Sequence, residues 1–361
     1  MIEVRDFDPG PEFWDRVLAR TQSALYALPE RAEAIVAALG PDGAATQRLM
    51  AFASSRGLTL SPVVVTQPSD PALARPAWFI GDIHGDLLGL EAALATIEGV
   101  DPGATVVFLG DLIDDGPYMY EVVLRLMDML GTQPDRVCLL AGNHDEALRP
   151  FAGEPPFVSS VNPGEFATWL SARSSDVTVS QVAHTYIGLV RHAPRAIFFP
   201  DGLLATHAGI PHTDLWPSLA SAADLEAPAC LADFAWNRLS EDRPIKRPNR
   251  ASKGCEVGYQ NFFDFCALAS NLLGRPVNRL IRGHDHVDAE LRHSIPPKWQ
   301  GRMATINNMC FALPREGTYF APFARMPAIA RWAPGDPLAV YSLKVPAAHI
   351  HAMYSAVSPE Q

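Results

Sequence analysis

The feature that most constrains the fold is a repeated unit in which a short apolar strand runs into a Gly-Asp pair and then a helix. The strand patterns AWFIGD (77–82), TVVFLGD (105–111) and RVCLLAGNHDE (136–146) alternate with the helix patterns 87–99 and 117–131. Proline opens the second helix pattern, and a glycine closes each of them, as is usual at helix ends. A β-α-β-α-β run of this kind predicts an α/β fold with a parallel sheet covered by helices.

Polar clusters follow the predicted strands. There are five, in the order GDIHGD (81–86), GDLIDDGP (110–117), GNHDE (142–146), THAGIP (206–211) and RGHDH (282–286). Each cluster alone is weak evidence, because an Asp-x-His after a strand is usually a turn with a satisfied histidine and a lone Gly-Asn-His is usually a loop. Because open α/β sheets bind ligands at the carboxyl ends of their strands, we expect the five clusters to lie together at one edge of the fold. Carboxylate, imidazole and amide ligands without thiolates suit Mn, Fe or Zn.

The rest of the chain divides around this core. Residues 11–56 have apolar side chains at helical spacing, and the proline-rich segment 61–76 reads as an extended connector, which predicts a helical N-terminal appendage over 1–76. The main domain is expected over 77–345, with further strands within 196–209, 278–286, 302–309 and 338–345. Residues 147–200 are expected to form a helical and loop cap, and 346–361 a surface tail.

In this order, the five clusters resemble those of the calcineurin-like metallophosphoesterases, and most of all the PPP phosphatases with their bacterial and phage members. The resemblance covers roughly residues 77–345 and implies an αββα sandwich that holds two divalent metal ions, Mn²⁺ first, with Fe or Zn as alternatives. It implies that Asp82 and His84 bind the first metal, that Asp111 bridges both, and that Asn143, His207 and His284 bind the second.

The same resemblance implies catalytic roles for three further residues. His144 would be the general acid, Asp114 would orient it, and Arg238 of the WNR stretch would hold the substrate phosphate. The implied reaction is hydrolysis of phosphomonoesters, phosphoproteins among them, by a metal-bridging hydroxide. These groups are chemically suited to phosphoester hydrolysis. A metal pair can activate water, an imidazole can supply a proton, and a planar guanidinium can hold two phosphate oxygens.

Two departures from the family pattern leave questions open. Asp115 stands where PPP enzymes carry a phosphate-binding arginine. It is predicted either to pair with Arg250 or Lys246, or to read a positive group on the substrate, or to cap a helix that starts at Pro117. Arg250 could instead replace the missing cation at the site. His286 of RGHDH is either an extra ligand of the first metal or a loop histidine.

Alternative functions follow from the same features. One is hydrolysis of phosphoanhydrides such as dinucleoside polyphosphates, and another is a binding module that has kept the fold and lost turnover. The net charge of −11 argues against nucleic acid as the main partner, so the expected partner is a phosphorylated protein or small molecule. The sequence lacks a membrane-length apolar run and a signal core, and its five cysteines are scattered, which predicts a cytoplasmic protein without membrane attachment.

Overall fold

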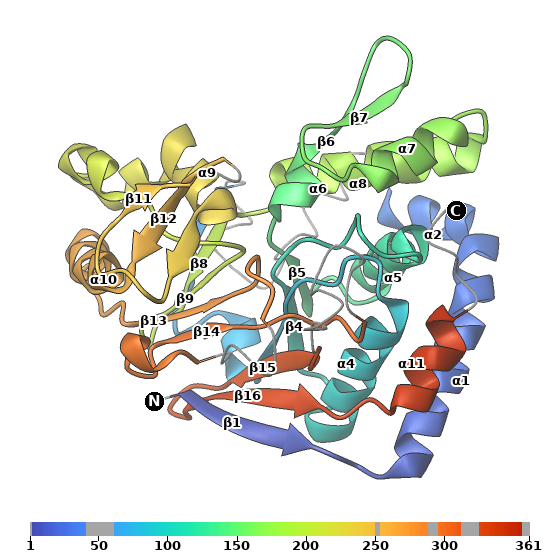
Figure 1. The fold of residues 1–361 in the computed structure, drawn as a ribbon, viewed down its shortest axis with the longest axis horizontal. Helices are drawn as coiled ribbons and strands as arrows, with labels where there is room; N and C mark the ends of the chain where they lie inside the picture. The colour runs from blue at the N-terminus through green and yellow to red at the C-terminus, as the bar shows by residue number, and fades with distance from the viewer. Residues whose placement is uncertain (1, 41–60, 250–252, 288–294, 312–324, 356–361) are drawn as a thin grey trace.

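Two mixed β-sheets face each other in the computed structural model, which describes residues 2–40, 61–249, 253–287, 295–311 and 325–355 (Figure 1). The first sheet has the order β1 (Ile2–Phe7), β16 (Leu338–Leu343), β15 (Ala328–Trp332), β3 (Ala77–Ile80), β4 (Thr105–Phe108) and β5 (Val137–Leu139). The second has the order β14 (Met303–Thr305), β13 (Arg279–Arg282), β9 (Leu203–Thr206), β8 (Ala196–Phe198) and β2 (Val63–Val65). Apolar side chains fill the space between them, among them Phe79, Val107, Ile197, Ala205, Ile281 and Val340.

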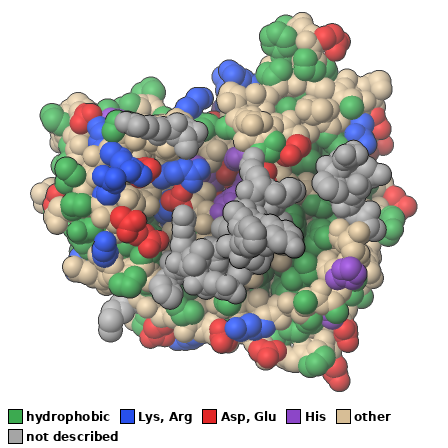
Figure 2. All heavy atoms as spheres, viewed as in Figure 1, with side chains coloured by type: hydrophobic (Ala, Val, Ile, Leu, Met, Phe, Trp, Pro, Cys, Tyr) green, Lys and Arg blue, Asp and Glu red, His purple; other side chains and the backbone are tan. Residues whose placement is uncertain are grey.

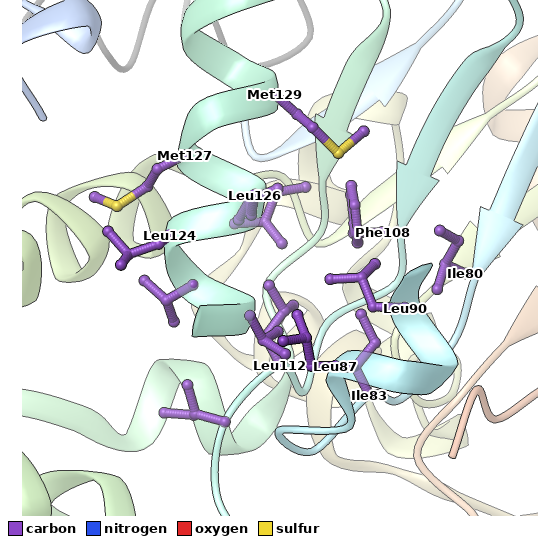
Figure 3. Close-up of a cluster of buried hydrophobic side chains, with 14 of the residues drawn as sticks. Ile80, Ile83, Leu87, Leu90, Phe108, Leu112, Leu124, Leu126, Met127 and Met129 are labelled. Atoms are coloured by element: carbon purple, nitrogen blue, oxygen red, sulfur yellow. The ribbon is translucent and has the colours of Figure 1, made fainter. Parts of the chain in front are cut away.

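Helices cover the outer face of each sheet. The first sheet carries α4 (Leu87–Val100) and α5 (Met119–Thr132), over which α1 (Pro11–Glu30) and α2 (Ala32–Leu39) pack. Figure 3 shows Ile80 and Phe108 of the sheet against Leu87 and Leu90 of α4. The second sheet shares a core with α9 (Pro228–Trp236) and α10 (Tyr259–Leu273). The predicted αββα sandwich is therefore confirmed.

The strand directions bring the five clusters together. Strands β3, β4 and β5 run parallel, and β13 runs parallel to both β9 and β14. All five clusters thus leave strands at their carboxyl ends. A backbone bridge between Asp82, after β3, and Asn307, after β14, joins the two sheets at this edge.

Smaller elements surround the strand ends. The segment after β5 forms α6 (Asn143–Ala147), a projecting hairpin of β6 (Leu148–Pro150) and β7 (Phe157–Ser159), then α7 (Glu165–Ala172) and α8 (Val177–His192) (Figure 1). A third sheet consists of β10 (Arg238–Ser240), β12 (Cys255–Gly258) and β11 (Arg247–Pro248). Short 3₁₀ turns occur at Pro71–Ala74, Thr213–Ser218, Ala222–Glu226 and Pro297–Trp299.

The chain ends are more integrated than the sequence predicts. Strand β1 pairs with β16, and β2 pairs with β8, so the N-terminal segment contributes strands as well as helices. The predicted helix over 11–56 is present as α1 and α2, and residues 41–60 lie outside the described part of the chain.

The expected surface tail is wrong for the described residues of the C-terminus. They form α11 (Ala347–Tyr354), which packs against α1. Its apolar residues Ile350 and Met353 lie three apart and so face the core together. No described helix is both long and apolar enough to cross a bilayer.

Candidate metal centre and active site

The loops at the strand ends hold an unusual backbone conformation. Six non-glycine residues of the described chain have positive φ, and five of them lie in the predicted clusters. They are His84 at 46°, Asp111 at 54°, Asp114 at 66°, Asp115 at 69° and His284 at 67°. Each such residue costs about 1–3 kcal/mol, and such strain gathers at functional sites. The stability of the surrounding sheets holds these side chains in fixed positions.

The glycines of the clusters make room for this arrangement. Gly110, with φ of 103°, lies so close to the next loop that a Cβ atom would come 2.3 Å from the backbone nitrogen of Gly142. A Cβ on Gly283 would come 2.0 Å from a carboxylate oxygen of Asp82. Only glycine permits these approaches, and Asp111 and His284 directly follow these two glycines.

A first group of potential ligands consists of Asp82, His84 and His286, whose ligand atoms all lie within 4.8 Å of one another. His84 Nδ1 donates to the carbonyl oxygen of Ile113 at 2.9 Å, which leaves Nε2 as the ligand atom. His286 Nε2 lies 3.4 Å from that Nε2 and 3.8 Å from Asp82 Oδ2. Of the two interpretations of His286, the geometry favours the ligand.

A second group consists of Asp111, His207 and His284, with Asn143 beside it. His207 Nδ1 donates to the carbonyl oxygen of Leu109 at 3.0 Å, so that Nε2 faces the site. That Nε2 lies 3.0 Å from Asn143 Oδ1 and 3.3 Å from Asp111 Oδ2. Asp111 Oδ2 is also 3.8 Å from His84 Nε2, so this carboxylate stands between the two groups.

The residues fit cations at both places. Asp82 Oδ2 and His284 Nε2 are buried polar atoms without a hydrogen-bond partner among the described residues, and a metal ion would satisfy both. Burial holds the pKa of His84 and of His284 well below its usual range, so both imidazoles are neutral, as metal binding requires. Burial also raises the pKa of Asp82, and the charge of Asp111 raises it further, a conflict that a nearby cation relieves.

His144 lies beside both groups at the start of α6. Its Nδ1 donates to Asp114 Oδ2 at 2.8 Å, and Asp114 Oδ1 accepts the backbone N–H of Phe166 at 2.9 Å. Burial lowers the pKa of His144, but the carboxylates of Asp111 and Asp114 outweigh it and raise the pKa to about 9. The ring is therefore protonated at neutral pH, and Asp114 fixes its orientation.

Arg238 follows α9 at the edge of the site. The preceding residue, Asn237, is buried and donates to the carbonyl oxygen of Ile210 at 2.9 Å, which anchors the turn. The Arg238 guanidinium pairs with Asp285, which lies between the two histidines of RGHDH. Both residues line a cavity of about 490 Å³ that also contains His286. Arg250 lies outside the described residues.

Asp115 does not cap a helix, so that prediction is wrong. Helix α5 begins at Met119 with Tyr118 as its N-cap. The side chain of Asp115 is only 4% exposed, and its Oδ2 lies 3.7 Å from His84 Nδ1. Lys246, one of its predicted partners, pairs with Asp214. The carboxylate therefore faces the site.

Sequence reasoning missed the residue that fixes the bridging loop. Asp145 accepts hydrogen bonds from the backbone nitrogens of Asp111, Leu112 and Gly142 at 2.7, 3.0 and 3.2 Å. It also accepts the hydroxyl of Tyr186 in α8 at 2.6 Å, which ties that helix to this loop. The position of Asp145 inside GNHDE was the one signal available. The cluster RGHDH likewise contains Asp285, whose role the sequence pattern alone does not indicate.

The surface agrees with this arrangement. Figure 2 shows histidine side chains near the middle of the viewed face, with basic and acidic side chains close by. A site with imidazoles, carboxylates and a guanidinium at the carboxyl ends of two facing sheets is suited to phosphoester chemistry.

The family profile of the calcineurin-like phosphoesterases matches residues 75–288, more than half of the chain and all five clusters. The chain belongs to this family. The resemblance predicted from the order of the clusters is thereby confirmed.

Relatives among the PPP phosphatases match shorter segments of this calcineurin-like phosphoesterase. The serine/threonine-protein phosphatase 6 catalytic subunit of Drosophila melanogaster is 37% identical over 73 residues, which are 20% of this chain and 24% of the relative. The PP2A-like phosphatase PPG1 of Candida albicans is 34% identical over 87 residues, 24% of this chain and 21% of the relative. The chain thus spans about a quarter of the length of these curated relatives.

A solved structure shares the fold over most of its length. It is a protein serine/threonine phosphatase from Saccharomyces cerevisiae with similarity to human phosphatase PP5. The TM-score is 0.57 at 14% identity, over 86% of this chain and 89% of that one. At this identity, the likeness establishes the fold alone.

Proposed function

We propose that this protein is a metal-dependent phosphatase that hydrolyses phosphomonoesters, with phosphoproteins among its substrates and Mn²⁺ as the preferred metal. The observation that carries the proposal is the pair of ligand groups with Asp111 standing between them, together with the unpartnered buried atoms of Asp82 and His284, one in each group. Fe and Zn are the alternative metals, because the same oxygen and imidazole ligands accept them. Asp82, His84, His286 and Asp111 would hold one ion, and Asp111, Asn143, His207 and His284 the other.

The residues of the chain divide the remaining work. When bound, two divalent cations lower the pKa of water and neutralise phosphate oxygens. His144 carries a proton on Nε2 for the leaving oxygen, while Asp114 holds its Nδ1. Arg238 presents a guanidinium to the phosphoryl group. The raised pKa of His144, about 9, keeps the acid form available at neutral pH.

The cavity beside the site favours a monoester over a nucleotide. Its described lining residues include three arginines and four carboxylates but no phenylalanine, tyrosine or tryptophan on which a nucleobase could stack. This disfavours dinucleoside polyphosphates. The hydrogen-bonded pair of His144 and Asp114 speaks against a module without turnover, because binding alone gives no use for a proton donor.

A leaving-group series tests the role of His144. Wild-type protein with Mn²⁺ should hydrolyse both p-nitrophenyl phosphate and phosphoserine. His144→Asn should lower kcat for phosphoserine by about 10²–10⁴-fold, since its alkoxide leaving group needs a proton. The loss should be much smaller for p-nitrophenyl phosphate, whose leaving group is stable as an anion.

His184→Asn is the matched control, because His184 is a histidine of α8 outside the ligand groups. It should leave both rates unchanged. An equal loss on both substrates in His144→Asn would remove the acid role. Absence of hydrolysis by the metal-loaded wild type on a phosphoester panel would contradict the proposed function itself.

A further inference from the structure

Three charged side chains form a continuous chain from the buried Arg282 to the half-exposed Arg238. Arg282 Nη2 donates to Asp285 Oδ2, and Arg238 Nη1 donates to Asp285 Oδ1. The exposed fraction rises along this Arg282–Asp285–Arg238 triad from 2% through 16% to 36% of the side chain. The inner end is therefore fixed in the protein, and the outer end faces the cavity.

The inner end is anchored to the loop after β9 and to the last residue of β14, both in the second sheet. Arg282 Nη1 donates to the carbonyl oxygen of Ala208, next to His207, at 3.1 Å, and its Nε donates to Thr305 Oγ1 at 3.1 Å. Asp285 directly follows His284, and its backbone nitrogen donates to Gly283 at 2.9 Å. The carboxylate of Asp285 thus has a position defined relative to two candidate ligands of the second metal.

The charges of the triad leave one net positive charge. Two guanidinium groups share one carboxylate, and the more exposed of the two is that of Arg238. Because Arg282 is buried, its positive charge needs the carboxylate of Asp285 as a partner. One oxygen of that carboxylate pairs with Arg282, and the second oxygen is available to orient Arg238. A contact through Nη1 occupies one corner of the planar guanidinium, so that its other N–H groups can meet two phosphate oxygens.

We infer that Asp285 is a positioning residue that holds the Arg238 guanidinium in the orientation needed to bind the phosphoryl group. The inference rests on the proposed function, because it assumes that a phosphoryl group occupies the centre. An arginine on the surface has many rotamers, and holding it in one of them removes an entropic cost from substrate binding. A carboxylate beside a phosphate site would otherwise be unfavourable, and the buried Arg282 offsets its charge.

A purely structural role makes a different prediction. If Asp285 merely neutralised Arg282, its removal would lower stability and leave phosphate affinity untouched in the folded protein. The two roles separate in a double-mutant cycle between Asp285 and Arg238.

The experiment measures binding of inorganic phosphate to Mn²⁺-loaded protein by isothermal titration calorimetry, together with KM and kcat for p-nitrophenyl phosphate. Asp285→Asn should raise the Kd of phosphate about tenfold, with KM rising more than kcat falls. In an Arg238→Ala background, the same change should alter the Kd less than about twofold. Full additivity, or an unchanged Kd in the single variant, would overturn the inference.

Two further variants keep the test decisive. Asp285→Glu keeps the charge that Arg282 needs but moves the carboxylate by one methylene, so phosphate affinity should still fall several-fold. An unchanged Kd in a folded Asp285→Glu protein would also overturn the inference.

Asp242→Asn is the control, because it removes an exposed carboxylate from the same cavity and should leave the Kd unchanged. A fall in affinity in this control equal to that in Asp285→Asn would reduce the effect to general charge and count against positioning.

Wild-type turnover separates this inference from the proposed function. If the metal-loaded wild type hydrolyses p-nitrophenyl phosphate and the cycle is additive, only the positioning role fails. If the wild type neither hydrolyses phosphoesters nor binds phosphate, the proposed function fails first.

Discussion

Three aspartates within GDLIDDGP have three different surroundings. Asp111 stands between the two ligand groups, Asp114 holds His144, and Asp115 is buried against His84. Each has a positive φ, so the loop turns sharply at each of them and aims the three carboxylates in different directions. Closely spaced carboxylates are tolerated here because imidazoles surround them, and cations would stabilise them further.

Asp115 should weaken phosphate binding in the present protein. Removing one negative charge from the edge of the site with Asp115→Asn should tighten the inhibition constant of inorganic phosphate by about 2–10-fold, because like charges several ångströms apart repel even at an effective dielectric constant of 20. Steady-state kinetics at constant ionic strength give this inhibition constant, and the metal content of each sample is determined alongside.

The opposite result would also be informative. Weaker phosphate inhibition in Asp115→Asn, at unchanged metal content, would mean that the carboxylate supports the site, and repulsion would be rejected. Asp214→Asn serves as the control, since Asp214 is an exposed carboxylate paired with Lys246 away from the ligand groups.

The predicted metal ligands share one property: each follows the carboxyl end of a strand by one to four residues. Position along the chain was enough to place Asp82, Asp111 and His284 together. The pairing of Arg238 with Asp285, 47 residues apart, depends on how the third sheet folds over the second. The contact of Asp115 with His84 depends on loop φ angles, which the residue types alone do not fix.

At the scale of elements, the C-terminal helix α11 supports the loop of the first ligand group. The hydroxyl of Tyr354 donates to Asp86, the N-cap of α4, and accepts the backbone N–H of Leu88 at 3.2 Å. Asp86 also accepts the backbone N–H of Cys310 at 2.5 Å. One carboxylate, two residues after His84, therefore joins three separate segments.

Tyr354→Phe should lower the free energy of unfolding by about 1–3 kcal/mol, because it removes a hydroxyl from a buried carboxylate that has to keep its donors. Urea denaturation gives the value. Tyr26→Phe is the control, since Tyr26 is 71% exposed on α1, and its free energy of unfolding should stay within about 0.5 kcal/mol of the wild type. Equal effects in the two variants would show that the hydroxyl of Tyr354 contributes no specific support.

Elements with strong periodicity were predicted, and short or edge elements were not. Helices α4 and α5 and strands β3, β4 and β5 each match a clear pattern bounded by glycine or proline. Strand β1 was missed because it is an edge strand with four consecutive exposed residues, and its apolar alternation is limited to Ile2 and Val4. Helix α11 was missed because its eight residues acquire an apolar face only by packing on α1.

At the scale of the whole molecule, two sheets converge so that loops from both form one centre. β3, β4 and β5 supply Asp82, His84, Asp111 and Asn143, and β9 and β13 supply His207 and His284. Neither sheet alone provides both ligand groups in full, because His286 belongs to the first group and Asp111 to the second. The αββα packing is therefore a condition for the site as well as for the core.

Metal stoichiometry tests this account most directly. Purified protein equilibrated with Mn²⁺ and passed over a desalting column should carry two ions per chain by elemental analysis. Asn143→Ala should lose mainly one ion, whereas Asp111→Asn should lose affinity at both places because its carboxylate stands between the groups. Two ions that remain bound in Asp111→Asn, or a fully active wild type that carries no metal, would contradict the account.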